Sequence, residues 1–358
     1  MLRLFLLAYL AGNIVEGQRA LIYVQAIWRH GDRAPKKLPY PKDQNTEASW
    51  PRGWAQLTNL GMQEMYDLGS FFRNRYKYFI GERFDMEKVG HNHIIFSSIS
   101  FLSLVKVMVK STNSERAIVS AQAFLRGMFP ANGSDAWLEG EAWQPLPFYS
   151  RTLGDSDAIL KPTDWKCSLY DKVSKQQNKD VFSKLEEKYA DFFLFLKNVT
   201  GFKKVDLDKA AALNNIEKEI IHKLPQPDWV YKRWPEYMNQ TTIEIIMELK
   251  RIRQINAFNS PEKARLRGGL LLGDWISRAT NISHDMSIRP SKMILYSTHD
   301  GTISSLMYAL GIGDEKLIPY AACLIMEIYK TPDNSSEIRV SIFCSLVIRI
   351  FKIKFILS

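Results

Sequence analysis

The sequence has few cysteines. Of its 358 residues only three are cysteine, Cys167, Cys323 and Cys344, which excludes a small domain held together by several disulfides. The count is odd, so in an oxidising compartment at least one thiol is unpaired or bridges to another chain. An intramolecular disulfide and buried cysteines that pack as small hydrophobic side chains both remain as alternatives.

Metal-binding and nucleotide-binding motifs are also missing. The chain has six histidines, and the H-x-H formed by His91 and His93 has no third ligand nearby in the sequence. There is no Walker pattern and no G-x-S-x-G, and the G-x-G at Gly311 and Gly313 marks the end of a helix because no strand precedes it in the required order. We therefore expect no metal and no cofactor.

Long apolar runs are absent from the first part of the chain. The apolar stretch at residues 4–10 follows Arg3 and precedes several small residues, and it is much shorter than the ~20 residues of a transmembrane helix. This arrangement predicts a secretory signal peptide over residues 1–17, with the mature chain beginning near Gln18. A membrane anchor is not evident.

The N-x-S/T glycosylation pattern also indicates the secretory pathway. Five sites match it and are glycosylation candidates: Asn132, Asn198, Asn239, Asn281 and Asn334. Each match alone is weak, but five of them on a chain with a signal sequence agree. We expect a secreted or lysosomal/lumenal glycoprotein.

Positive charge exceeds negative charge, but it is not gathered in one block. The formal net charge is +10. Lys and Arg are scattered among acidic residues, whereas chains that bind nucleic acid concentrate them in patches or stripes. We therefore expect no nucleic-acid partner. A basic balance also suits an enzyme whose substrate is a small anion.

Strand-like and helix-like segments alternate in both halves of the chain. Apolar, β-rich runs at residues 21–28, 105–110 and 292–298 are followed by helical patterns at residues 57–79, 117–125 and 301–312, the first of which Thr58 can cap. Such alternation predicts an α/β fold with a mostly parallel central sheet flanked by helices. The Lys- and Glu-rich residues 151–267 predict a smaller helical insertion subdomain, and residues 18–150 and 268–358 the α/β catalytic domain.

Charged residues follow three of the predicted strands. These tips are residues 29–33, 110–116 and 299–300. Because the carboxyl ends of parallel strands meet at one edge of a sheet, where ligands bind, we expect the tips to converge. Several arginines around two histidines and one carboxylic acid suit a tetrahedral dianion, above all phosphate, which guanidinium groups bind through bidentate hydrogen bonds without a metal.

The motifs R-H-G-D-R-A-P, K-S-T-x-x-x-R and a late H-D resemble those of the histidine acid phosphatases, and within them the prostatic and lysosomal acid phosphatase group. Other similar segments are WPRGWAQLTNLGMQEMYDLG, FPANGSDAWLEGEAWQPLP, RLRGGLLLGDWI and IPYAACLIMEIY. The resemblance extends from about residue 21 to residue 329. It implies a phosphoglycerate mutase-like histidine phosphatase fold, a metal-independent acid phosphatase acting on small phosphate monoesters, and a homodimer.

The resemblance also implies roles for individual residues. His30 would be the nucleophile that forms a phosphohistidine, and Asp300 the proton donor. Phosphate would be bound by Arg29, Arg33, Arg116 and His299. We place Asp32 in a supporting role, holding an arginine. Each of these residues also has an explanation that involves no catalytic or binding role. A charged side chain at the end of a strand is usually solvated, and Asp300 can cap a helix.

The chain departs from the family pattern in two places. Residues 89–104 add apolar, Ser-rich material, and residues 340–358 replace the family's C-terminal strands with an alternating pattern that suits an edge strand or a tail. Cys167 and Cys323 would then lack their usual partners. Two other functions stay open: a phytase-like inositol polyphosphate phosphatase, to which Lys36 and Lys37 would contribute, and a catalytically impaired secreted binding or antigen-like homologue.

Overall fold

The computed structural model describes residues 19–84, 86–87, 104–344 and 347–351. The predicted signal peptide lies outside these residues, as do His91 and His93 with residues 89–103 of the added segment. The end of the tail, residues 352–358, lies outside them too.

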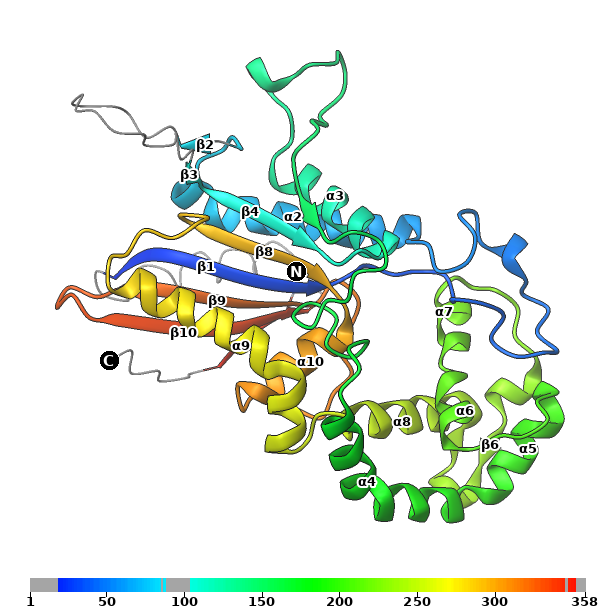
Figure 1. Cartoon of the computed structure of the whole chain (residues 1–358). Coiled ribbons are helices and arrows are strands. Elements are labelled where there is room, and N and C mark those ends of the chain that lie inside the picture. The colour runs from blue at the N-terminus through cyan, green and yellow to red at the C-terminus, as the bar shows by residue number, and fades with distance from the viewer. Residues whose placement is uncertain (1–18, 85, 88–103, 345–346, 352–358) are drawn as a thin grey trace, which may run out of the picture.

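A seven-stranded mixed sheet forms the centre of the α/β part, in the order β11-β10-β9-β1-β8-β4-β5 (Figure 1). Its strands are β1 (Ala20–Arg29), β4 (Val107–Ser111), β5 (Tyr149–Ser150), β8 (Met293–Thr298), β9 (Cys323–Lys330), β10 (Ser336–Cys344) and β11 (Val347–Phe351). Strands β1, β8, β4 and β5 pair in parallel, whereas β9, β10 and β11 form antiparallel pairs beyond β1. The predicted α/β fold is confirmed, and β11 is the predicted edge strand.

Helices cover both faces of the sheet (Figure 1). On one face lie α2 (Asn59–Ile80) and α3 (Glu115–Met128), and on the other α9 (Pro261–Ser283) and α10 (Asp300–Ala309). Strand β1 is buried on both sides: Trp28 belongs to the apolar cluster under α2 and α3, and Ile27 to the cluster under α9 and α10. This explains the unbroken apolar run in its sequence, because a strand covered on both faces has no solvent-facing positions.

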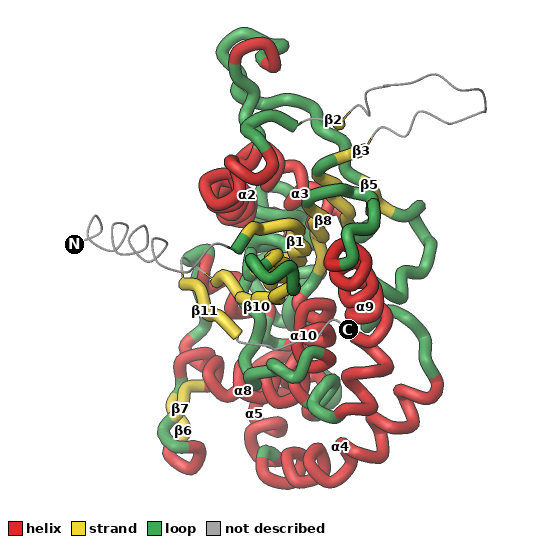
Figure 2. The backbone as a smooth tube through the Cα atoms, turned by 90° about the vertical axis from the view of Figure 1, so that its left-hand side faces the viewer, coloured by secondary structure: helices red, strands yellow, loops and turns green. Residues whose placement is uncertain are grey.

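A second group of helices lies beyond one end of the sheet (Figures 1 and 2). It contains α4 (Ser168–Lys188), α5 (Ala190–Thr200), α6 (Leu207–Ala212), α7 (Asn215–Ile221) and α8 (Thr242–Ile255). These helices share an apolar cluster of their own, with Phe192, Leu207 and Ile245 fully or almost fully buried. Helix α9 runs through residue 267, so it continues from this group onto the sheet.

The remaining elements are short. They are the strand pairs β2 (Met86–Glu87) with β3 (Leu104–Val105) and β6 (Arg233–Trp234) with β7 (Gln240–Thr241), and the 3-10 helices η1 (Glu47–Ser49), η2 (Gly133–Asp135), η3 (Asp228–Tyr231) and η4 (Pro235–Tyr237). They connect the larger elements and carry none of the predicted site residues.

The register of the parallel strands brings the three charged tips to one level. Arg29 at the end of β1 lies opposite Thr298 at the end of β8, and Ser297 pairs with Ser111 at the end of β4. The next residues along each strand are His30, His299 and Thr112, so all three leave the sheet side by side. The predicted convergence of the tips therefore follows from the strand register.

Candidate active site

The loop after β1 is held against the start of α2 by two glycines. A Cβ placed on Gly31 would lie 2.2 Å from the carbonyl oxygen of Gly61, and a Cβ on Gly61 would lie 2.1 Å from the carbonyl oxygen of Asp32. Thr58 caps α2 as predicted, since its side chain accepts from the backbone N–H of Gly61. Its own N–H donates to the carbonyl oxygen of Asp32 at 3.0 Å. The residues between His30 and Arg33 are thus fixed by backbone contacts.

His30 is buried, with 3% of its surface exposed. Its Nδ1 lies 2.8 Å from the carbonyl oxygen of Gly31, which can only accept, so Nδ1 carries the proton and Nε2 keeps its lone pair. Burial, together with the charges of Arg29, His299 and Arg116, holds the pKa of His30 well below its usual value of 6.5. The lowered pKa favours the neutral imidazole, the form that a nucleophile requires.

Three arginines surround this imidazole with unused donors. In the described part of the chain, Arg29, Arg33 and Arg116 each have a buried Nε–H without a hydrogen-bond acceptor, and none of them forms a salt bridge with a carboxylate. Arg29 donates to the carbonyl oxygen of Ile318 and lies over the Tyr320 ring, 3.9 Å from its centroid. Burial lowers the pKa of Arg33, and burial with the charge of Arg33 lowers that of Arg116 to about 10. Concentrated, unpaired guanidinium groups of this kind provide a site for an anion.

His299 lies beside His30, with their ring centroids 5.5 Å apart. Its Nδ1 accepts from Arg116 Nη2 at 3.3 Å, so the proton is on Nε2, which lies 3.0 Å from Thr112 Oγ1. Burial and the charge of Arg116 lower the pKa of His299 to about 3. In this arrangement the ring directs its proton to Thr112 and orients Arg116. The donation from His299 to phosphate that the resemblance implies stays a prediction.

Asp300 is the first residue of α10, and His299 is the N-cap, so Asp300 is not the capping residue. Its Oδ1 accepts from the N–H of Gly301 at 2.9 Å. Burial alone would raise the pKa of Asp300, but the charges of Arg29 and Lys250 and the Gly301 hydrogen bond hold it below its usual range. The carboxyl group is therefore close enough to the arginines to sense their charge.

Asp32 does not hold an arginine through a hydrogen bond, contrary to our expectation. Its Oδ2 accepts from Thr58 Oγ1 at 2.6 Å and from His222 Nε2 at 2.5 Å. The expectation failed because the partner comes from the C-cap of α7, 190 residues along the chain. His222 is partly buried, with 24% of its side chain exposed, whereas His284 is exposed.

The helices beyond the sheet add two lysines that the sequence did not single out. Lys218 on α7 is 4% exposed, and burial with the charges of Arg33 and Arg29 lowers its pKa to about 7. The charge of Lys250 on α8 acts on Asp300, and burial lowers the pKa of Lys250 too. No motif could have indicated these lysines, because their place depends on how α7 and α8 pack.

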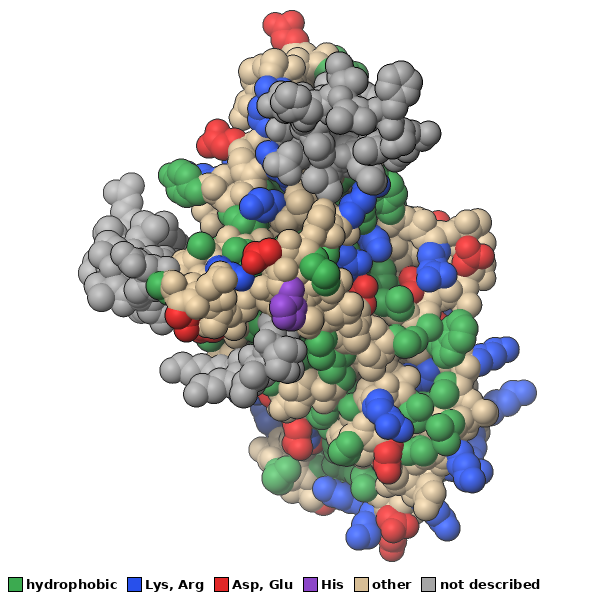
Figure 3. Space-filling model, turned by 60° about the vertical axis from the view of Figure 1, so that its left-hand side comes forward, with side chains coloured by type: hydrophobic (Ala, Val, Ile, Leu, Met, Phe, Trp, Pro, Cys, Tyr) green, Lys and Arg blue, Asp and Glu red, His purple; other side chains and the backbone are tan. Residues whose placement is uncertain are grey.

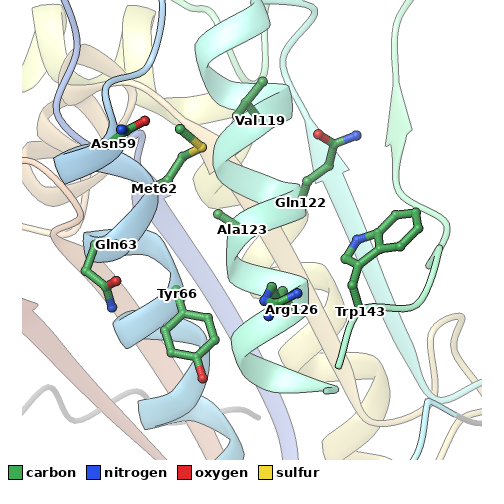
Figure 4. A pocket seen from close by; sticks show the side chains of 9 residues that line it. All are labelled: Asn59, Met62, Gln63, Tyr66, Val119, Gln122, Ala123, Arg126 and Trp143. Atoms are coloured by element: carbon green, nitrogen blue, oxygen red, sulfur yellow. The ribbon is translucent and has the colours of Figure 1, made fainter. Parts of the chain in front are cut away.

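A groove elsewhere on the surface is not this site. It has a volume of about 420 Å³, and its lining side chains lie on α2 and α3, apart from Trp143, which lies on the segment after α3 (Figure 4). They are Asn59, Met62, Gln63, Tyr66, Val119, Gln122, Ala123, Arg126 and Trp143. Within the described residues no cluster of histidine, cysteine, aspartate or glutamate side chains is arranged to hold a metal ion. No helix there is long and apolar enough to span a bilayer.

The comparisons with known proteins agree with this geometry. Residues 20–343 match the family model of the histidine phosphatase superfamily (branch 2). The chain is 30% identical to prostatic acid phosphatase of Bos taurus over 92% of this chain and 79% of that protein. It is 28% identical to lysosomal acid phosphatase of Xenopus laevis over 90% of this chain and 69% of that one. The chain therefore belongs to the histidine phosphatase superfamily, branch 2.

Solved structures show the same fold at lower sequence identity. The phytase of Hafnia alvei in complex with tartrate matches with a TM-score of 0.62 and 17% identity, over 92% of this chain and 85% of that one. The phytase of Klebsiella sp ASR1 matches with a TM-score of 0.59 and 15% identity, over 91% and 83% of the two chains. At these identities the likeness concerns the fold.

Proposed function

We propose that this protein is a metal-independent acid phosphatase that hydrolyses phosphate monoesters through a phosphohistidine intermediate. The observation that carries the proposal is the set of buried, unsatisfied Nε–H donors of Arg29, Arg33 and Arg116 around a neutral imidazole. The family and its curated members support the same reaction. No cofactor is required, because guanidinium groups can stabilise the charge on the equatorial oxygens of the transferred phosphoryl group.

In the first step, Nε2 of His30 attacks the phosphorus of the bound monoester. The N–P bond forms while the bond from phosphorus to the leaving alcohol oxygen breaks, and Asp300 gives its proton to that oxygen. The Nδ1–H of His30 keeps its hydrogen bond to the Gly31 carbonyl and stabilises the positive ring. The arginines remain on the phosphoryl oxygens, and His299 keeps Arg116 in position.

In the second step, the carboxylate of Asp300 takes a proton from water, whose oxygen attacks the phosphorus. The N–P bond breaks, its electron pair returns to Nε2 of His30, and inorganic phosphate leaves. The two half-reactions thus restore the proton on Asp300 and the lone pair on His30, so the cycle is balanced without a further reactant.

The charges of the site account for an acid working range. In the empty site Asp300 is ionised, because Arg29 and Lys250 outweigh the effect of burial. A bound phosphate adds negative charge that offsets these cations, so it raises the pKa of Asp300 and favours the protonated acid. Burial and the neighbouring cations lower the pKa of His30, which favours its unprotonated form as the pH falls.

We also propose that the chain passes through the secretory route and forms a homodimer, as the family resemblance implies. Its N-terminal sequence and the N-x-S/T sites support the first proposal. Of the five candidate asparagines, Asn132, Asn198, Asn239 and Asn334 are exposed, whereas Asn281 is partly buried in α9. Cys167, Cys323 and Cys344 are all free thiols in the structure.

On the face shown in Figure 3, basic side chains are interspersed with acidic ones. Among the described residues visible on that face, no continuous basic stripe is seen. This mixture supports a small anionic substrate bound in the arginine site in preference to an extended polyanion bound on the surface.

The test is hydrolysis of p-nitrophenyl phosphate by the secreted, purified chain at pH 5 with EDTA present. We expect turnover that survives EDTA and is inhibited by vanadate and by tartrate. Phytate is assayed in parallel, and faster release from phytate would favour the phytase-like alternative. A folded chain that binds phosphate without turnover would instead identify the impaired binding protein.

A further inference from the structure

The carboxylate of Asp32 is buried beside the phosphate arginines and yet is held by neither of its arginine neighbours. Asp32 is 1% exposed, and it lies in the loop between His30 and Arg33. Its negative charge acts on Arg33 and contributes to the pKa of that group. A free carboxylate at this place would compete with a phosphate for the same guanidinium groups.

His222 binds one oxygen of this carboxylate in the structure. Its Nε2 lies 2.5 Å from Oδ2 of Asp32, and the same oxygen accepts from Thr58 Oγ1 at 2.6 Å. The imidazole itself packs edge-on against Trp50, with ring centroids 5.0 Å apart. Oδ2 of Asp32 is thereby held by residues of α2 and α7, whereas its Oδ1 is buried without a hydrogen-bond partner.

The backbone around Asp32 is tied to the same two helices. Its N–H donates to Glu64 Oε2 on α2 at 2.7 Å. On α7, Lys218 precedes His222 by one helical turn, so both side chains lie on the face that meets the loop. The Asp32–His222 contact therefore joins the helices beyond the sheet to the nucleophile loop.

We propose that His222 is a positioning residue that sequesters the Asp32 carboxylate and so leaves Arg33 and Arg29 available to the phosphoryl group. The inference rests on the proposed phosphatase function of the site. Without His222, the Asp32 carboxylate keeps a single hydrogen-bond donor, Thr58, and turns to the nearest cation. Phosphate must then displace a carboxylate before it binds.

The experiment measures the dissociation constant of inorganic phosphate by calorimetry, together with kcat and KM for p-nitrophenyl phosphate. We expect His222→Ala to weaken phosphate binding about ten-fold and to raise KM more than it lowers kcat. In the double variant Asp32→Asn with His222→Ala the competing charge is gone, so binding should return to within about three-fold of wild type. His222→Gln, which still offers one donor, should weaken binding only about two- to three-fold.

The double variant separates positioning from a purely structural role, because loss of packing would make it at least as poor as His222→Ala. The control is His284→Gln, which alters another histidine at a helix C-cap and should leave every parameter unchanged. Equal phosphate binding by wild type and His222→Ala, or no recovery in the double variant, would overturn the inference.

If His222→Ala does not fold, phosphate binding is compared between His222→Gln and the double variant His222→Gln with Asp32→Asn. Recovery of phosphate binding in the variant with Asn supports the inference, and its absence overturns it. A folded wild-type chain that binds no phosphate would be a different failure, because it would overturn the proposed function itself.

Discussion

Gly31 and Gly61 meet with no room for a side chain on either. A Cβ on Gly31 would lie 2.2 Å from the Gly61 carbonyl oxygen, a distance at which the backbone must move. The contact joins the loop that carries His30 to the first turn of α2. The position of the nucleophile thus depends on glycine, which has no Cβ, at both Gly31 and Gly61.

Gly61→Ala should lower both stability and activity. The new Cβ would lie 2.1 Å from the carbonyl oxygen of Asp32, so the loop must shift. We expect a cost of about 2–4 kcal/mol in unfolding free energy and a loss of kcat of at least about ten-fold. The control is Gly273→Ala in α9, where a Cβ meets nothing within 4 Å. That change should stabilise the helix by about 0.5–1 kcal/mol, as measured by thermal and urea unfolding.

His30→Ala should abolish turnover while phosphate still binds. The arginines are untouched, so the dissociation constant of phosphate should change only a few-fold. The loss of kcat should be at least about 10³-fold, because His299, the other histidine of the site, accepts from Arg116 on Nδ1 and carries its proton on Nε2. The measurement combines p-nitrophenyl phosphate hydrolysis with rapid quenching of labelled substrate under alkaline conditions, which preserve phosphohistidine. Near-normal turnover in the variant would refute the nucleophile assignment.

Asp300→Asn should slow the two half-reactions to different degrees. Loss of the acid matters most for an alkyl phosphate, where we expect kcat to fall about 10²–10⁴-fold. Nitrophenolate is a leaving group that needs no proton from Asp300, so phosphorylation of His30 continues. Attack by water on the phosphoenzyme slows because the base is missing. The labelled phosphoenzyme should therefore accumulate with p-nitrophenyl phosphate. The same loss for both substrates, with no accumulated intermediate, would argue against an acid and base at this position.

The buried carboxyls of Asp43 and Glu219 should make stability depend on pH. Burial raises the pKa of both, that of Glu219 from 4.5 to about 7, and an unpartnered oxygen on each is explained by one shared proton. The folded chain keeps this proton at pH values where the unfolded chain has lost it. The contribution of this proton to the free energy of unfolding is therefore complete below about pH 4.5 and is lost as the pH rises through about 7.

The neighbours of this pair are Tyr40, Asn45 and Gln226, the last two of which donate to Glu219 Oε2. Glu219→Gln keeps the shape and removes the titration. We expect wild type to lose about 1–2 kcal/mol of stability between pH 5 and pH 8 that the variant retains. The measurement is urea unfolding across this pH range. If the free energy of unfolding changed with pH equally in wild type and in Glu219→Gln, the shared proton would be contradicted.

Lys218→Met should stabilise the chain and weaken its site. At pH 5 the lysine is charged, buried and repelled by Arg33 and Arg29. This buried charge lowers the free energy of unfolding, and the full cost applies below the folded pKa of Lys218 of about 7. We expect a gain of about 1–2 kcal/mol at pH 5 and a smaller gain at pH 9, where the native lysine is neutral. Phosphate affinity should fall several-fold because a cation is lost. Lower stability at pH 5 would contradict the prediction.

Local sequence patterns were enough to predict much of the α/β part. The unbroken apolar run of β1, the Thr58 cap of α2 and the charged tips after β1, β4 and β8 all follow from short-range rules. Convergence of the tips could be predicted because parallel strands end at a common edge. Arg29, His30, Arg116 and His299 accordingly lie together.

Contacts between distant segments could not be predicted in the same way. The pairing of Asp32 with His222 depends on how α7 docks, and nothing in the periodicity of a helix says which remote loop its face will meet. The roles of Lys218 and Lys250 were missed for the same reason. The tautomer of His299 was also beyond the sequence, because it is set by Arg116 on one side and Thr112 on the other.

The central place of β1 in the sheet affects how the protein is made. Among the described strands of the sheet this one leaves the ribosome before the others, yet the strands on either side of it, β8 and β9, begin only at Met293 and Cys323. Its apolar side chains and open edges must wait for almost the whole chain to be synthesised. A growing chain should therefore depend on chaperones to keep this segment from aggregating, and fragments that stop before β9 should accumulate as insoluble material.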